Sequence, residues 1–363
     1  MPLIEKKDVE NLLRTFVDPH HDLDLVSAKS IKAINIDEDK VAVEVELGYP
    51  AKTYVEQLKS ELIQHLQALT GVNQIAVDIN VKIISHAVQQ ALKPHPNVKN
   101  IIAVASGKGG VGKSTTAVNM ALALSAEGAT VGILDADIYG PSIPTMLGLQ
   151  GYPQSEDNKT MMPKLAYGIQ TMSIGYLIAA DQPMIWRGPM ATNALQQLLR
   201  DTNWSNVDYL IVDLPPGTGD IQLTLAQQIP VSGAVIVTTP QDIALLDAQR
   251  GLGMFEKVNV PVLGIVENMS VHICSHCGHA EAIFGEGGGK TMALKNKIDF
   301  LGSLPLDIQI RQFADSGRPT VIAAPESQAA QIYREIARKT AAKLALKAKD
   351  FSTRFPTIVV QNT

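Results

Sequence analysis

The chain has 363 residues, of which 45% are hydrophobic and 18% are charged. This composition is ordinary for a globular protein, so it excludes wholesale disorder and a fibrous repeat, and the length allows two or three domains. The net charge of −5 provides no basic field to draw the chain onto nucleic acid or an anionic membrane, so we expect neither as a partner.

The N-terminal sequence MPLIEKKDVENLL has acidic residues where a secretion signal needs a basic start and an apolar run. No apolar run in the sequence approaches the roughly 18 residues of a membrane-spanning helix. We therefore expect a soluble, cytoplasmic protein.

Residues 1–85 carry the patterns of a small α/β domain with the order helix, two strands, helix, strand. Apolar residues recur at helical spacing over 9–16 and again over 55–69. The string KVAVEVEL at 40–47 alternates apolar and polar residues, as a half-buried strand does. The same alternation over 75–81 predicts the last strand of this domain.

A linker is predicted at 86–100, where LKPHPNVKN contains two prolines around a histidine. The residue before a proline avoids the helical region, so this segment favours an extended conformation. We expect it to join the small domain to a second domain at 101–346, which is followed by a C-terminal tail at 347–363.

From residue 101 onward, short and nearly continuous apolar runs alternate with helical stretches. The runs are NIIAVAS, ATVGILDAD, VDYLIVDLPPG, SGAVIVTTP and VPVLGIVENM. Strands buried on both faces have this texture, which is typical of a mostly parallel sheet covered by helices on both faces. The predicted fold class is therefore α/β, and the Ala-rich stretch 326–349 predicts a long helix near its end.

The first apolar run leads into the glycine-rich loop SGKGGVGKST, which fits G-x-x-x-x-G-K-[ST] between a strand and a helix. Its glycines let successive amides turn toward phosphate oxygens, and the helix presents its partly positive end to the same place. Lys113 can reach the β and γ phosphates of ATP, and the Ser114 hydroxyl can bind Mg²⁺. The predicted nucleotide-binding residues of the loop are Gly107, Lys108, Gly109, Gly110, Val111, Gly112, Lys113, Ser114 and Thr115.

Aspartates end two of the apolar runs, at the edge where ligands of parallel sheets collect. Asp135 and Asp137 close the run GILDAD, and Asp213 closes YLIVD. A single aspartate at a strand end can equally cap a helix, so the combination with the glycine loop is what favours a nucleotide site. Asp135 would support Mg²⁺ or its waters, and residues 217–220 would form a switch that senses the γ phosphate.

The only two cysteines, Cys274 and Cys277, lie in the string HICSHCGH. A pair this close cannot staple a long chain, so it favours a chemical role. A redox pair is one reading, and a zinc site completed by His272, His276 or His279 is another. The favoured reading is a [4Fe–4S] cluster, because a two-fold dimer supplies the four thiolates that such a cluster needs.

Taken together, these motifs resemble one family. GKGGVGKST resembles the deviant Walker A loop of the MinD/ParA class of P-loop ATPases. The stretches DADIYGPS, DLPPG and NMS ahead of C-x-x-C narrow the resemblance, over roughly 101–346, to the Mrp/ApbC-type iron–sulfur cluster carrier ATPases. The resemblance implies a homodimer with Cys274 and Cys277 as ligands of a labile cluster. Such a dimer receives the cluster from donor or scaffold proteins and passes it to apo-proteins while hydrolysing ATP.

The resemblance also implies roles for single residues of the nucleotide site. Lys108 would reach across the dimer to the partner's nucleotide, Asp213 would help to hold Mg²⁺ through its water shell, and Asp137 would position the attacking water. Asn268 would read the adenine, which an amide can do by donating and accepting hydrogen bonds. The predicted catalytic residues are Lys108, Lys113 and Asp137.

Residues 1–85 resemble the small iron–sulfur assembly domain that is often fused in front of this ATPase, through an Asp-Pro turn and the stretch DLVSAKSI. Many copies of that domain carry a cysteine near the position of GYPAK at 48–52, and this chain has none there. We therefore expect a docking or regulatory role for this domain in place of thiol chemistry.

Two other functions stay open at this point. A positioning ATPase of the MinD/ParA type would dock its ATP-bound dimer on membrane or DNA, and the basic stretch 334–354 could then touch anionic lipid. The cysteine pair would have no task in such a protein. A zinc-stabilised ATPase scaffold would use the pair without any cluster chemistry.

Overall fold

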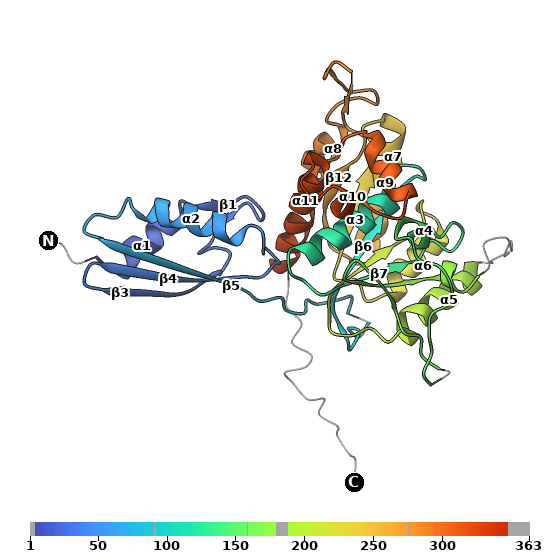
Figure 1. The fold of residues 1–363 in the computed structure, drawn as a ribbon, viewed down its shortest axis with the longest axis horizontal. Coiled ribbons are helices and arrows are strands. Elements are labelled where there is room, and N and C mark those ends of the chain that lie inside the picture. The colour runs from blue at the N-terminus through green and yellow to red at the C-terminus, as the bar shows by residue number, and fades with distance from the viewer. Residues whose placement is uncertain (1–3, 91, 158, 179–187, 275, 348–363) are drawn as a thin grey trace, which may run out of the picture.

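The computed structural model describes residues 4–347, apart from residues 91, 158, 179–187 and 275. It consists of a small three-stranded body, here called the N-terminal unit, and a large domain built on an eight-stranded sheet (Figure 1). The predicted α/β class, with a small α/β domain ahead of a mostly parallel sheet, is confirmed.

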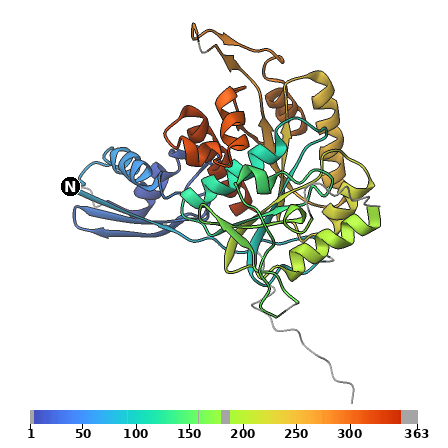
Figure 2. The same cartoon turned by 45° about the vertical axis from the view of Figure 1, so that its right-hand side comes forward.

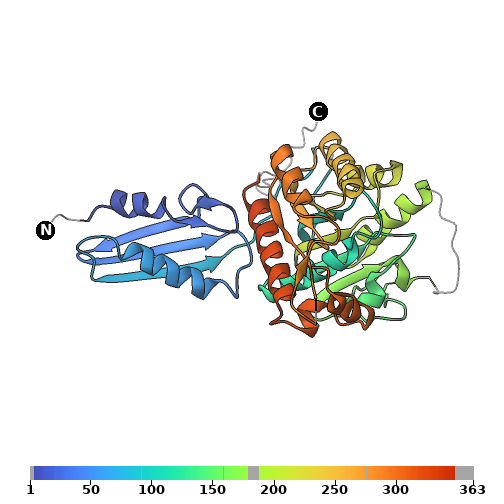
Figure 3. The same cartoon turned by 90° about the horizontal axis from the view of Figure 1, so that it is seen from above.

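The N-terminal unit packs two helices on one face of its sheet (Figure 3). Its elements are α1 (Lys6–Leu13), β1 (Val17–Asp18), β2 (Leu23–Asp24), β3 (Ile31–Asp37), β4 (Lys40–Leu47), α2 (Val55–Leu66) and β5 (Gln74–Val81). β3 and β4 pair antiparallel, whereas β4 and β5 run parallel and therefore need α2 as their crossover. The valines of β4 and the leucines of α2 form its buried core.

The first helix is shorter than its apolar pattern predicts. The pattern continues to Phe16, but α1 ends at Leu13 and the chain turns there. Phe16 instead places its ring edge-on against His65 of α2, with ring centroids 5.5 Å apart. Phe16, which the apolar pattern assigned to the helix, thus lies outside it and packs against another element of the same unit.

The large domain is organised around a sheet with the strand order β15-β12-β11-β6-β10-β7-β9-β8. Its strands are β6 (Val98–Ala105), β7 (Val131–Asp135), β8 (Lys164–Ala166), β9 (Ile169–Ser173), β10 (Val207–Asp213), β11 (Gly233–Thr238), β12 (Val262–Glu267) and β15 (Phe300–Ser303). Every neighbouring pair is parallel except β8 and β9 at one edge. The five apolar runs form the contiguous centre, from β12 to β7, and the strands without such runs lie outside them.

Helices cover both faces of this sheet (Figure 2). They are α3 (Lys113–Ala126), α4 (Ile143–Met146), α5 (Gly188–Asp201), α6 (Asp220–Gln228), α7 (Asp242–Lys257), α8 (Gly288–Asn296), α9 (Ile308–Asp315), α10 (Thr320–Ala323) and α11 (Gln328–Ala345), with a 3₁₀ turn η1 (Ile174–Tyr176). Alternate residues of β6 enter two separate cores, one with α3 and α11 and the other with α5 and α7. The sheet is therefore buried on both sides.

The helix that follows the glycine loop lies deep in the large domain. Ten of the 14 residues of α3 are buried, because α3 lies between the sheet and α11. α11 occupies 328–345 of the predicted Ala-rich helix, with Ile336 and Leu344 fully buried. The predicted tail beyond residue 347, and with it the end of the basic stretch, falls outside the described residues.

The segment between the two bodies is partly tied to the large domain. β6 begins at Val98, inside the predicted linker, and the side chain of its Asn100 receives the backbone N–H of His86 and donates to the carbonyl of Ile84. In the part of the chain that the structure describes, no helix is both long and apolar enough to cross a bilayer.

Candidate nucleotide and cluster site

The glycine loop connects β6 to α3 in a conformation that only glycine allows at several points. Gly110 and Gly112 have φ angles of 82° and 81°, in the left-handed region that favours glycine. A Cβ on Gly107 would lie 2.1 Å from the backbone of Asp247 in α7, and one on Gly112 would lie 2.1 Å from Asn268 Nδ2. The loop is therefore packed closely against its neighbours at the first turn of α3.

A buried ion pair lies at the base of the loop. β6 and β10 are adjacent parallel strands, so the end of β10 brings Asp213 beside the start of α3. Lys113 Nζ donates to Asp213 Oδ1 at 2.5 Å and to Ser114 Oγ at 3.2 Å. The side chains of Lys113 and Asp213 are 6% and 0% exposed, so the two charges neutralise each other away from water.

The second carboxylate oxygen of Asp213 suits a cation site. Oδ2 is buried and accepts no hydrogen bond from the described residues. Carboxylate and hydroxyl oxygens are the ligands that Mg²⁺ prefers, either directly or through water. Ser114 Oγ and Asp213 Oδ1 both accept hydrogen bonds from Lys113 Nζ, so the two residues predicted to contact Mg²⁺ are neighbours here.

Asp135 lies one strand further along, opposite Asp213 in the register of β7 and β10. Its oxygens accept hydrogen bonds from Ser173 Oγ at 3.0 Å and from the backbone N–H groups of Ile143 and Asp137 at 3.2 Å. Its contacts thus hold the chain that leads from β7 to α4. The predicted support of Mg²⁺ by Asp135 stays a prediction, and its role in fixing this chain was missed by sequence reasoning.

Burial, followed by the negative charge of Asp213, raises the pKa of Asp135 to about 7. Burial also raises the pKa of the half-buried Asp137, and the positive charge of Lys113 opposes that rise. Asp137 therefore lies within electrostatic reach of the lysine and of Asp213. Its predicted task of positioning water stays a prediction.

The raised pKa of Asp135 predicts how the free energy of unfolding depends on pH. Between pH 4 and pH 7 the native Asp135 keeps a proton that the unfolded chain has lost, so its contribution to the free energy of unfolding falls as pH rises. We expect Asp135→Asn to remove this slope, which for one proton is about 1.4 kcal/mol per pH unit. Urea unfolding of metal- and nucleotide-free protein at pH 5, 6, 7 and 8 measures it. The exposed Asp78→Asn is the control, and a slope equal in both variants would contradict the assignment.

Asn268 contacts the glycine loop directly. It follows β12, and its Nδ2 donates to the carbonyl of Val111 at 2.8 Å, while its backbone N–H donates to Thr238. The side chain is thus a support for the loop, a role that sequence reasoning missed because the partners are 157 positions apart. The predicted reading of adenine by Asn268 is not tested by this contact.

The predicted switch runs beside the loop. Gly217 has a φ angle of 104°, and its N–H donates to the carbonyl of Ser106 at 2.9 Å. Gly109 faces Pro216, since a Cβ added to this glycine would lie 3.9 Å from the proline ring. Lys108 is exposed on the same loop, so its side chain is accessible to a partner molecule.

The cysteine pair lies at the tip of a projecting hairpin, the orange loop at the top of Figure 1. Its strands are β13 (His272–Ile273) and β14 (Ala280–Glu281), which pair antiparallel. The N–H of Cys274 donates to His279, and the N–H of Gly278 donates to Cys274, both at 2.9 Å. Cys277 is exposed and Cys274 is partly exposed.

Backbone amides activate one of the two thiols. The N–H groups of Cys277 and His276 lower the pKa of Cys274, because they stabilise the thiolate. His272, a predicted zinc ligand, instead directs Nδ1 to the carbonyl of Leu306 at 3.0 Å. Within the described ranges, which omit Ser275, no three His, Cys, Asp or Glu side chains come together in a way that could hold a metal ion.

One short segment joins the two candidate sites. Asn268 supports the glycine loop, and Cys274 follows only six residues later. Met269 between them adopts a left-handed φ of 58°, which costs energy for a residue with a side chain. Ser270 is tied to Leu304 through both its N–H and its hydroxyl at 3.0 Å. The first half of the segment is therefore held in place at Asn268 and at Ser270.

Comparisons with known proteins agree with this arrangement. The family described as NUBPL iron-transfer P-loop NTPase matches residues 97–341, and the family described as iron–sulfur cluster assembly protein matches residues 6–79. The iron–sulfur cluster carrier protein of Escherichia coli (strain K12) is 53% identical over 340 residues, covering 93% of this chain and 91% of that protein. The iron–sulfur cluster transfer protein NUBPL of Mus musculus is 53% identical over 69% of this chain and 80% of its own length.

Solved structures agree with the fold. The nucleotide-binding protein of Archaeoglobus fulgidus in complex with ADP is 40% identical and has a TM-score of 0.55, covering 61% of this chain and 88% of that one. The cell division ATPase MinD of Pyrococcus furiosus shares the fold at 20% identity, with a TM-score of 0.50. The family match over residues 97–341 and the 53% identity to a carrier over 93% of the chain show that this chain belongs to the family of iron–sulfur cluster carrier P-loop NTPases.

Proposed function

We propose that this chain is an ATP-dependent carrier that holds a [4Fe–4S] cluster between two copies of itself and passes it to apo-proteins. The observation that carries the proposal is the segment 268–274, which supports the phosphate loop at one end and presents the first thiol at the other. A change in the loop can therefore reach the cluster ligands through one hydrogen bond and six residues of chain. The names of the similar carrier and transfer proteins support delivery as the outcome.

The number and exposure of the thiols favour a cluster shared by two copies. A [4Fe–4S] cluster takes four thiolates, and each chain has two, at the tip of a projecting hairpin. A two-fold axis between two such tips supplies all four. The lowered pKa of Cys274 favours the thiolate that binds iron, and the exposure of Cys277 favours release to a recipient.

Exposed apolar side chains on α7 and on the cysteine hairpin favour contact with a second copy of the chain. Ile243 and Leu246 at the start of α7 are each 65% exposed, and Ile273 on the hairpin is 50% exposed. α7 packs against Gly107, so the same surface borders the glycine loop and Lys108. Ile243 and Leu246 lie three positions apart on one helix, and large exposed apolar residues this close together are typical of interaction sites. A copy docked here would bring its own Lys108 toward the neighbouring nucleotide.

The chain's own residues account for the handling of ATP. The loop amides orient the phosphates, and Lys113 exchanges Asp213 for the β and γ phosphate oxygens. That exchange leaves Asp213 available, with Ser114, to hold Mg²⁺, which supplies positive charge against the phosphates when bound. Asp137 orients water for hydrolysis. A shift of the loop on nucleotide binding moves Asn268 through its hydrogen bond to Val111, and so moves the chain that leads to the hairpin.

Anaerobic reconstitution with iron and sulfide tests the proposal. We expect a brown protein of twice the chain mass that holds about four iron and four sulfide per two chains. Absorbance, metal and sulfide content, and mass by size-exclusion chromatography with light scattering measure this. Bound zinc in place of iron would favour a zinc-stabilised scaffold. Failure to take up any cluster, with ATP hydrolysis intact, would favour a positioning ATPase, and either result would contradict the carrier function.

A further inference from the structure

The helix that follows the phosphate loop ends on a buried carboxylate. α3 begins at Lys113, and its C-terminal cap is Glu127, which is 2% exposed. A negative side chain at this end opposes the partial negative charge of the helix terminus, so lysine or arginine would be the locally favoured choice. Local helix stability therefore does not explain Glu127, and its partners lie elsewhere in the chain.

The N-terminal unit supplies most of those partners. The backbone N–H of Thr53 donates to Glu127 Oε2 at 2.9 Å, and the Thr53 hydroxyl donates to Oε1 at 2.6 Å. The N–H of Lys52 donates to the backbone carbonyl of Glu127 at 3.1 Å. These two residues come just before α2, so the N-terminal unit is hydrogen-bonded to the far end of the phosphate-loop helix.

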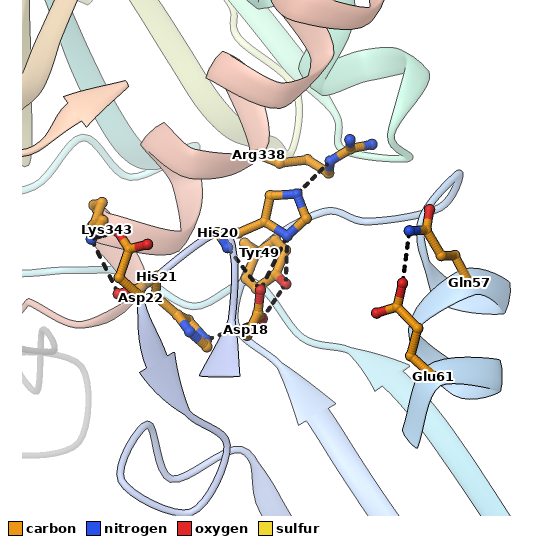
Figure 4. A network of polar contacts seen from close by, with 9 residues as sticks. All are labelled: Asp18, His20, His21, Asp22, Tyr49, Gln57, Glu61, Arg338 and Lys343. Carbon is orange, nitrogen blue, oxygen red and sulfur yellow. Dashed lines mark hydrogen bonds and ion pairs between the residues drawn. The ribbon is translucent and has the colours of Figure 1, made fainter. Parts of the chain in front are cut away.

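Arg338 of α11 ties the same carboxylate to a second part of the N-terminal unit. Its Nη1 donates to Glu127 Oε1 at 2.8 Å, and its Nε donates to His20 Nε2 at 3.0 Å. Figure 4 shows this guanidinium above His20, whose Nδ1 lies within hydrogen-bond distance of Oδ1 of the fully buried Asp18, at 3.1 Å. The Glu127 side chain is fully buried and that of Arg338 is 12% exposed, so the pair is largely removed from water.

The bodies also meet closely at the end of α11. A Cβ placed on Gly48 would lie 2.9 Å from the Cβ of Ala345. Lys343 donates to Asp22 at 2.8 Å and to the carbonyl of His21 at 3.1 Å. The stretch that lacks the expected cysteine, 48–52, is thus part of the surface by which the N-terminal unit docks.

We propose that Thr53 and Glu127 are positioning residues of the nucleotide site, through which docking of the N-terminal unit sets the affinity for nucleotide. α3 spans about 21 Å from Lys113 to its end and is packed on both sides, so it transmits a displacement as a rigid element. Coupling between two sites is reciprocal, so bound nucleotide strengthens docking in turn. The inference rests on the proposed nucleotide site, and it assigns regulation of that site to the N-terminal unit.

The first test removes one hydroxyl from the interface. We expect Thr53→Val to weaken Mg·ADP binding by about fivefold or more, the lower end of typical couplings between sites. Thr53→Ser keeps the hydroxyl and is expected to restore wild-type binding. Thr70→Val makes the same change at an exposed position of the N-terminal unit and is the matched control. Titration of each full-length protein with a fluorescent ADP analogue and Mg²⁺ measures the dissociation constants.

The second test separates the domains without removing a polar group. Gly48→Leu adds a bulky side chain at a position where even a Cβ would lie only 2.9 Å from the Cβ of Ala345. We expect the same loss of nucleotide affinity as in Thr53→Val, together with faster amide hydrogen exchange at 52–54. Wild-type protein is expected to exchange more slowly there when Mg·ADP is added.

The outcomes distinguish the inference from the proposed function. A wild-type protein that binds no nucleotide would overturn the proposed function. A wild-type protein that binds nucleotide, with unchanged affinity in both Thr53→Val and Gly48→Leu, would overturn the coupling alone. An equal loss in Thr70→Val would also overturn it, because the effect would then not depend on the docked surface.

Discussion

Lys113→Ala is expected to lower the rate of ATP hydrolysis by at least about 100-fold, the usual effect of removing one donor that stabilises the transferred charge. It is also expected to lower the free energy of unfolding of the nucleotide-free protein by about 3–5 kcal/mol, because Asp213 would remain as an unpaired buried charge. Phosphate release and urea unfolding measure the two effects.

Two further variants make this prediction sharper. Adding Asp213→Asn to Lys113→Ala removes the unpaired charge, so most of the lost stability is expected to return while hydrolysis stays as low as in Lys113→Ala. Lys108→Ala removes an exposed lysine of the same loop and is expected to leave the stability unchanged. More than a tenth of wild-type hydrolysis in Lys113→Ala would show that this lysine does not contact the reacting phosphates.

Cys274→Ala is expected to abolish cluster binding, with less than one tenth of the wild-type iron retained after anaerobic reconstitution. One thiol per chain gives a dimer only two of the four thiolates that a [4Fe–4S] cluster needs. Affinity for Mg·ADP is expected to stay as in the wild type, since the contact of Asn268 with Val111 is untouched. Absorbance, iron content and nucleotide titration of the same sample measure both properties.

The matched control replaces the two exposed histidines of the same hairpin tip. His276→Ala/His279→Ala leaves both thiols in place and is expected to keep the cluster. A loss of metal in this double variant, with zinc in the wild type, would instead identify a site completed by histidine. Full iron binding in Cys274→Ala would contradict the assignment of the cluster to the thiol pair.

The interface between the bodies bears on how such a carrier is regulated. Glu127 and Arg338 of the large domain pair with each other and also hydrogen-bond to Thr53 and His20 of the N-terminal unit. Buried charged groups are costly to leave without their hydrogen bonds, so this surface favours one docked arrangement. Its position at the end of α3 places the N-terminal unit where it can respond to nucleotide without touching it. The proposed coupling would give the cysteine-free unit a regulatory role beside cluster carriage by the large domain.

Local pattern predicted much of this molecule. The five apolar runs identified the five central strands, because strands buried on both faces need uninterrupted apolar residues. The outer strands β8, β9 and β15 were not predicted, since they are short and interrupted by polar residues or glycine. The phosphate loop was recognisable because its residue types and their spacing are themselves the requirement for holding phosphates.

The sequence by itself therefore determined the fold class, the loop and the thiol pair, all of which depend on residues close together in the chain. Only the tertiary structure decided that Asn268 supports Val111 from 157 positions away. It also decided that Glu127 is held by Thr53 and Arg338, 74 and 211 positions away. Such contacts follow from how the strands and helices pack, and no local periodicity records which distant residue will fill a given hydrogen bond.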